Sequence, residues 1–141
     1  MISRRYLWPF LLPFVMLKPA LAIEIWHSDT VWANQGMCSA TFTLDSGAEP
    51  VSQLDIGIEL VNARQEVVSV DHLVVAPFGT SEATRYQSTS AEGEHYCDDT
   101  LSIRITSLAE VANGVQKRLP LSLITPRHFT PFTIVTAPRD K

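Results

Sequence analysis

The feature that most constrains the fold is a two-residue alternation of apolar and polar side chains. In residues 38–44 every even position is apolar and every odd position carries a hydroxyl. Residues 54–60 and 101–105 alternate in the same way. Because successive side chains of a β-strand point to opposite faces of the sheet, this pattern predicts strands with one buried and one solvated face. The side chains of these three runs that we expect to form the core are Ala40, Phe42, Leu44, Leu54, Ile56, Ile58, Leu60, Leu101, Ile103 and Ile105.

The remaining strands have weaker patterns. Residues 66–75 are apolar on both phases, which is typical of a strand covered on both sides or of a strand with a bulge. Pro120 indicates an edge position, since proline cannot donate to a strand ladder. The one helical candidate is a single turn near residues 107–113. Further strands are expected at residues 23–26, 82–88, 115–123 and 132–134, with turns at 45–47, 62–64 and 112–114.

Seven or eight short strands in about 119 residues predict one all-β domain, an antiparallel β-sandwich over residues 23–141. A fibronectin type III arrangement fits better than an antibody-type immunoglobulin domain. Residues 54–60 lack a tryptophan that could pack on a central disulfide, and Tyr96 directly precedes Cys97 instead of standing two residues before it.

The first 22 residues have the order of a secretory signal peptide. Arg4 and Arg5 precede an apolar run over residues 6–17, and Ala20-Leu21-Ala22 forms an A-x-A cleavage site. A membrane anchor is the alternative, but the run contains two prolines and is shorter than the roughly 20 residues that span a bilayer. We therefore expect cleavage after Ala22, no membrane span in the mature protein, and a secreted or periplasmic location.

Cys38 and Cys97 are the only two cysteines of the chain. An exported protein meets an oxidising compartment, so we expect the pair to form a disulfide that closes a loop of about 60 residues. Such a bond is worth on the order of 4 kcal/mol in the chain-entropy model. A redox role is the alternative, but the chain has no C-x-x-C motif, which favours a structural bond.

Charge is unevenly distributed along the mature chain. Residues 23–141 hold eight basic and fifteen acidic residues, a formal charge of −7, with −11 on residues 23–110 and +4 on residues 111–141. An acidic body excludes nucleic acid as an expected partner. The opposite charges favour docking of the terminal strands on the acidic body, either their own or that of a second chain. We therefore predict a homodimer that exchanges a terminal strand, with residues 112–114 as the hinge.

Catalytic motifs are missing from the sequence. The four histidines are scattered, and none belongs to a metalloprotease motif or lies near a nucleophile elbow, so we expect neither an enzyme nor a cofactor. Residues 92–99 offer up to five oxygen or nitrogen ligands for a cation such as calcium. They lack the EF-hand spacing, which favours a solvated charge run over a metal site.

Recognition is expected in the longest polar stretch, residues 79–93, because loops on a rigid sandwich commonly bind partners. Within and just beyond this stretch, the candidate binding residues are Arg85, Tyr86, Glu92 and Glu94. Trp26 and Trp32 are interpreted as packing residues, although exposed aromatics are also frequent interface hot spots.

The chain resembles small bacterial exoproteins of the IrmA type, fibronectin III-like mimics of interleukin receptors. The resemblance rests on the signal peptide, on residues 35–43 (QGMCSATFT) opening a strand, and on Cys97 ahead of residues 101–105. It implies a secreted domain, a domain-swapped dimer and binding to a host protein such as a cytokine. The leading hypothesis is thus a non-enzymatic protein-binding sandwich. The alternative is a periplasmic assembly factor or inhibitor that acts on an envelope enzyme or surface fibre, and fractionation of cells and medium separates the two.

Overall fold

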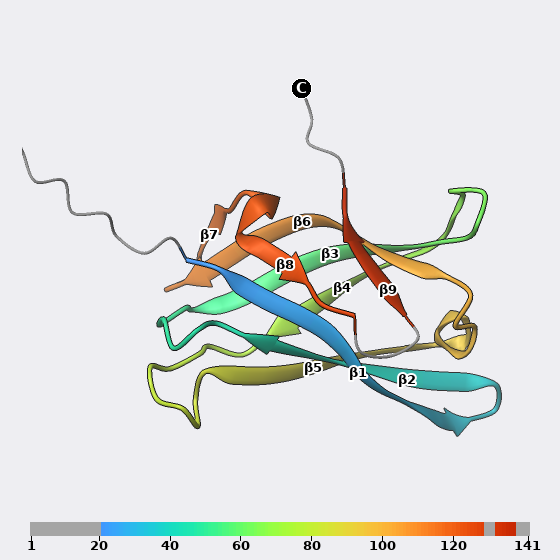
Figure 1. The fold of residues 1–141 in the computed structure, drawn as a ribbon, viewed down its shortest axis with the longest axis horizontal. Helices are drawn as coiled ribbons and strands as arrows, with labels where there is room; N and C mark the ends of the chain where they lie inside the picture. The colour runs from blue at the N-terminus through green and yellow to red at the C-terminus, as the bar shows by residue number, and fades with distance from the viewer. Residues whose placement is uncertain (1–20, 129–131, 138–141) are drawn as a thin grey trace, which may run out of the picture.

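Two sheets pack face to face in the computed structural model, which describes residues 21–128 and 132–137 (Figure 1). The predicted signal peptide, residues 1–22, lies outside the described residues except at its last two positions. The described residues form nine strands and no α-helix, which confirms the all-β sandwich.

The first sheet has the strand order β5-β2-β1-β8. β1 and β2 form a hairpin through a turn at Gln35 and Gly36, both at positive φ, as a two-residue hairpin turn of type I′ requires. β8 pairs with β1 in parallel. The strands are β1 (Ile23–Asn34), β2 (Met37–Asp45), β5 (Tyr86–Gly93) and β8 (Ile124–Pro126).

The second sheet has the order β4-β3-β6, and two short strands share the far edge of β6. β7 pairs antiparallel with the end of β6, and β9 pairs in parallel with its beginning. The strands are β3 (Gln53–Val61), β4 (Val67–Val75), β6 (Ser102–Ala112), β7 (Val115–Arg118) and β9 (Thr133–Thr136).

Two 3-10 helices complete the fold. The helix η2 (Glu94–Cys97) follows β5 and leads the chain from the first sheet to the second, and η3 (Leu121–Leu123) separates β7 from β8. Within residues 21–128 and 132–137, no helix has the length and apolar character needed to cross a lipid bilayer.

The core lies between the two sheets and confirms the strand phases read from the sequence. All ten predicted core side chains are buried, and the most accessible of them exposes 6% of its surface. Ile134 of the terminal strand β9, and Phe132 just before it, join the same cluster. Full burial of such side chains is worth about 1.5 to 3 kcal/mol each, so one continuous core carries both sheets.

β4 is an edge strand, and its two apolar phases have different environments. Leu73 and Val75 face the core, whereas Val70 and Val74 are exposed. A register shift opposite Leu60 marks the bulge, one of the two expected alternatives. Coverage on both sides is wrong, because Val70 and Val74 on the outer face of this strand are 71% and 48% exposed.

Four predicted boundaries are wrong, and the first is the strand expected over residues 82–88, which begins only at Tyr86 and ends at Gly93 as β5. Residues 107–113 form no helical turn but continue β6, where Ser107 lies against Gly57 at a bulge. The strand expected over residues 115–123 ends at Arg118, and after Pro120 the chain makes the η3 turn. β1 continues eight residues beyond the predicted Trp26, because pairing with β2 stabilises its polar half.

Candidate functional site

The disulfide Cys38–Cys97 is present and marks one end of the sandwich, called here the disulfide end. Cys38 lies at the start of β2 and Cys97 ends η2, with 5.2 Å between their Cα atoms. The bond therefore ties a strand of the first sheet to the connection that leads to the second. Cys38 is buried, whereas Cys97 is exposed on the outer side of the bond.

An aromatic cluster fills the core beside this disulfide. The ring of His27 lies 4.9 Å from that of Phe132 and 5.7 Å from that of Phe42, centroid to centroid. Tyr96 contacts Phe132 edge to face at 6.4 Å. The Tyr96 hydroxyl donates a hydrogen bond to Asp71 on β4, so η2 is joined to the second sheet as well as to the first.

His27 is a buried polar residue within this cluster, on the apolar phase that begins with Ile23 and Ile25. Its Nε2 lies 2.9 Å from the carbonyl oxygen of Asp29 and 2.6 Å from the hydroxyl of Thr30. Burial lowers the pKa of His27 below its ordinary value, because the charged imidazolium loses hydration. The neutral ring therefore packs as an aromatic side chain in the folded protein.

A pocket of about 280 Å³ opens at the disulfide end. The aromatic rings of His27, Tyr96 and Phe132 form part of its lining, and Asp29 and Asp99 contribute exposed carboxylates. Ser28, Thr30 and Cys97 complete it. The pocket thus combines apolar ring surface with negative charge.

Trp32 projects from the β1–β2 hairpin at the same end and is 68% exposed. Its interpretation as a packing residue is wrong, whereas Trp26 is partly buried. In the register of the hairpin Trp32 lies opposite Cys38, beyond the last buried residue of β1. The hairpin tip stands away from the second sheet there (Figure 1), so the indole lacks the cover that the core gives to His27.

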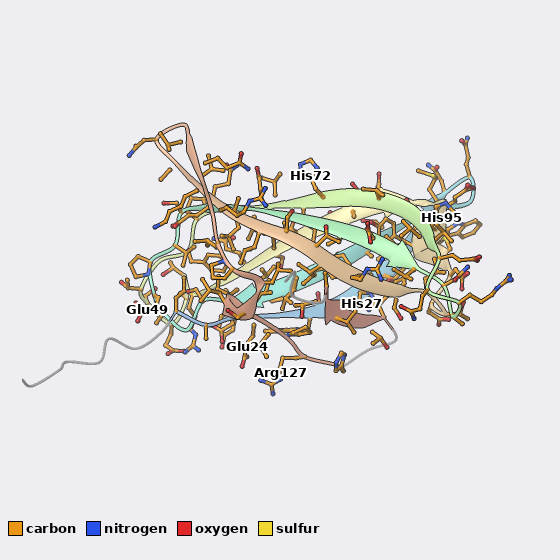
Figure 2. All side chains as sticks on the ribbon, turned by 90° about the horizontal axis from the view of Figure 1, so that it is seen from above. Glu24, His27, Glu49, His72, His95 and Arg127 are labelled. Atoms are coloured by element: carbon orange, nitrogen blue, oxygen red, sulfur yellow. A yellow bond between two sulfur atoms is a disulfide. The ribbon has the colours of Figure 1, made fainter. Side chains whose placement is uncertain are left out.

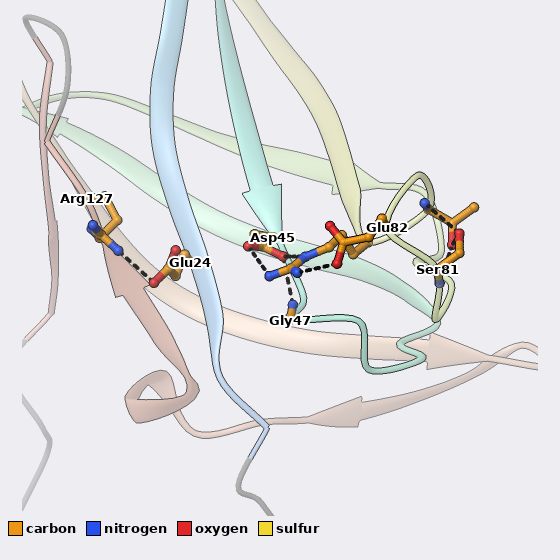
Figure 3. A network of polar contacts seen from close by, with 8 residues as sticks. Glu24, Asp45, Gly47, Ser81, Glu82 and Arg127 are labelled. Atoms are coloured by element: carbon orange, nitrogen blue, oxygen red, sulfur yellow. Dashed lines mark hydrogen bonds and ion pairs between the residues drawn. The ribbon is translucent and has the colours of Figure 1, made fainter.

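The opposite end of the sandwich, called here the loop end, is built on charges (Figure 3). Arg85 binds both carboxylate oxygens of Asp45, at 2.8 and 2.9 Å, and contacts Glu82 at 3.2 Å. The backbone N–H of Gly47 also donates to Asp45. The hydrogen bond from Arg85 holds the pKa of Asp45 below its usual range, so this carboxylate stays ionised.

The four candidate binding residues lie at both ends of the molecule. Residues 79–93 do not form one loop, because β5 begins at Tyr86, and binding by these four residues stays a prediction. Arg85 and Tyr86 stand at the loop end, whereas Glu92 and Glu94 stand at the disulfide end. An eight-residue strand spans about 25 Å, too far for one small ligand. Figure 2 shows the same separation, with His27 and His95 toward one end and Glu49 toward the other.

The acidic run at residues 92–99 is likewise dispersed. Asp98 accepts hydrogen bonds from the backbone N–H and the hydroxyl of Thr100, which lower the pKa of Asp98. Across the described parts of the chain, no group of three or more His, Cys, Asp or Glu side chains is arranged to hold a metal ion.

The sequence analysis missed the pocket at the disulfide end. One signal could have found it: the alternation Ile23, Ile25, His27 places a histidine in line with core residues. No sequence pattern indicated that Asp99 would line the pocket, because its position there depends on η2 lying beside β1.

Comparison with known proteins gives one family and one solved structure. The sequence model of the family IrmA, interleukin receptor mimic protein A, matches residues 23–126, the range from the first residue of β1 to the last of β8. The structure of IrmA from Escherichia coli is similar at 29% sequence identity with a TM-score of 0.69, covering 81% of this chain and 98% of that chain. No curated protein sequence matches the chain.

Proposed function

The chain belongs to the IrmA family, interleukin receptor mimic protein A, and we propose that it acts by binding a host protein of the interleukin class. The observation that carries this proposal is the family match, which includes every strand from β1 to β8. A protein that imitates a receptor works by presenting a surface, so a non-enzymatic role follows. The candidate binding residues lie at opposite ends of the sandwich, which agrees with a binding surface better than with a compact catalytic site.

We further propose that the protein is exported and acts in the medium or the periplasm. The disulfide supports this location, because such bonds persist in oxidising compartments. The family match begins at Ile23, the first residue after the predicted cleavage site. N-terminal sequencing of protein recovered from medium and periplasm should read Ile-Glu-Ile, and an uncleaved N-terminus in both fractions would contradict the proposal.

A homodimer that exchanges terminal strands is a further part of the proposal. Its support is electrostatic and topological. Arg127 of the basic terminal segment pairs with Glu24 of β1 at 2.7 Å (Figure 3), and β8 and β9 dock in parallel on β1 and β6. Two chains could make the same contacts if the turn at Asn113 and Gly114 opened. Light scattering at micromolar concentration should give twice the chain mass, and a concentration-independent monomer mass would rule the exchange out.

The binding proposal is tested with protein exported under its own leader and immobilised for interferometry. A panel of recombinant human interleukins is passed over it, with the same panel over the reduced, unfolded protein as control. We expect saturable binding of at least one interleukin to the folded protein alone. If none binds and the protein is retained in the periplasm, the periplasmic assembly or inhibitor role takes its place.

A further inference from the structure

The hairpin tip of β1 and β2 carries exposed apolar surface that the fold does not use. Val31, Trp32 and Met37 are exposed by 54, 68 and 37%, within seven residues of one another. A solvated indole on a rigid hairpin gains free energy when a partner covers it, and tryptophan is enriched among the residues that dominate interface energies. The tip is therefore suited to contact another protein.

The register of the hairpin connects this tip to the pocket. Residues two apart on a strand share a face, so Trp32 lies on the same face as Thr30, which lines the pocket. Trp32 also stands opposite Cys38, whose disulfide partner Cys97 lines the pocket from the other side. The register thus places Trp32 next to the pocket, on the strand face of Thr30.

The charge of this surface has a single sign. Residues 29–40 and 90–101 contain five carboxylates and no lysine or arginine. Within the described residues, neither Asp29 nor Asp99 forms an ion pair, and Arg64 on the nearby β3–β4 turn pairs with Glu66. A cation that enters the pocket therefore meets two carboxylates that no described lysine or arginine pairs with, and burial disfavours the charged form of His27, which Asp29 would attract.

We propose that the pocket at the disulfide end receives an arginine or lysine side chain of the protein partner, and this rests on the proposed binding function. Its volume of about 280 Å³ is at the small end for ligand pockets and suits one side chain. The aliphatic stem packs on the rings of Tyr96 and Phe132. The cationic head lies between Asp29 and Asp99, within reach of the face of Trp32, where a cation–π contact adds to the charge attraction.

The first test uses N-acetyl-arginine amide as the probe and two-dimensional NMR of the exported, disulfide-bonded protein. We expect saturable shifts at millimolar probe concentration for the Trp32 indole N–H and for Thr30, and none with N-acetyl-glutamine amide, which lacks the charge. Trp32→Ala and the isosteric Asp99→Asn should each weaken binding by up to about tenfold. Both positions are exposed, so both variants should keep the melting temperature of the parent.

Val74→Ala is the matched control, since Val74 is an exposed apolar residue on the outer face of β4, outside the pocket and outside the candidate binding residues. It should leave the titration unchanged. Equal shifts with the glutamine probe would contradict the proposed binding of a cationic side chain. Binding by Trp32→Ala and Asp99→Asn that equals binding by the parent would contradict it as well.

The second test separates failure of the pocket from failure of the proposed function. The interleukin panel is repeated with Trp32→Ala and Val74→Ala. Loss of binding in the first variant alone supports the pocket, and equal binding by both variants overturns it while the function stands. If no interleukin binds the parent but the arginine probe still titrates Trp32, the function fails and the pocket stands as a cation site. If Trp32→Ala instead converts a dimer to a monomer, the occupant is a second copy and the proposed partner is wrong.

Discussion

The two ends of the sandwich are closed by different interactions. The disulfide end combines a covalent bond with the packed rings of His27 and Phe132, and it leaves the indole of Trp32 in solvent. The loop end has no disulfide and is held by polar contacts, chiefly the two hydrogen bonds between Arg85 and Asp45. The disulfide end thus adds a covalent bond to its apolar packing, whereas the loop end adds paired charges to the buried contact of Val51 and Phe78.

This difference determines which charges remain available for a partner. Arg85, a sequence candidate for binding, uses its guanidinium on Asp45 and Glu82 and covers Tyr86 at 5.2 Å. Asp29 and Asp99 form no ion pair within the described residues, and their end is held by a disulfide and aromatic packing. A charged side chain that already pairs within the protein has fewer hydrogen bonds and less unpaired charge available for a ligand.

The strongest challenge to the disulfide end is Phe42→Ala, which removes a fully buried ring beside His27. We expect it to lower the free energy of unfolding by about 3 to 5 kcal/mol, from lost burial and the cavity left behind. Thr41→Ala, on the solvated face of the same strand, should cost little. Urea unfolding measures both, and equal losses would mean that the pairing phase of β2 is reversed.

Cys38→Ser tests the covalent part of the same end. Opening the loop between Cys38 and Cys97 should lower the free energy of unfolding by roughly 2 to 5 kcal/mol, because the unfolded chain gains conformational freedom. Urea unfolding measures this change. A thiol titration of the native exported parent is the control, and two reactive thiols there would contradict the bond.

Acidification should weaken the disulfide end through His27. Its pKa is lowered by burial, so its stabilising contribution is complete above its ordinary value of 6.5 and is lost as pH falls through the lower folded value. The melting temperature should therefore decline as pH falls from about 8 to about 5. His27→Gln should flatten this decline, whereas the exposed His72→Gln should preserve it; an unchanged slope in His27→Gln would refute the assignment.

The smallest effect is expected at the loop end. Arg85→Ala should lower the melting temperature by less than Cys38→Ser, since Arg85 is close to solvent that screens the pair. Arg64→Ala, which breaks a longer and more exposed pair with Glu66, should change it even less. Because Arg85 holds the pKa of Asp45 low, its contribution is present above 3.8 and should disappear as pH falls through the lower folded value. If Arg85→Ala lowered the melting temperature as much as Cys38→Ser, the ion pair and the disulfide would contribute equally to stability, which contradicts this expectation.

The strands that alternate cleanly could be predicted because both of their faces have a simple environment. Residues 38–44, 54–60 and 101–105 each have one face in the core and one in water. The alternation of apolar and polar side chains therefore shows which face is buried. The cysteine pairing could be predicted because the chain offers only one intramolecular choice. These local signals sufficed for the sandwich and for its core.

The candidate site could not be predicted in the same way. The register shift between His27 and Asp29 moves Trp32 onto the face that is buried in the first half of β1, yet Trp32 is exposed because the hairpin tip stands away from the second sheet. From the sequence, Arg85 is expected to be an unpaired charge. In the fold, Asp45 at the end of β2 lies beside it and accepts its hydrogen bond. In both cases the decisive neighbour is distant in sequence.

The sequence by itself determined the all-β class, the phase of the core strands and the disulfide, since hydrophobic periodicity and thiol chemistry act at the level of the single chain. Only the tertiary structure decided that β7 and β9 share the edge of β6, and that Asp29 and Asp99 line one pocket with three aromatic rings. The physical reason is that burial of a side chain depends on its own polarity, whereas the grouping of charges on a surface depends on which strands become neighbours.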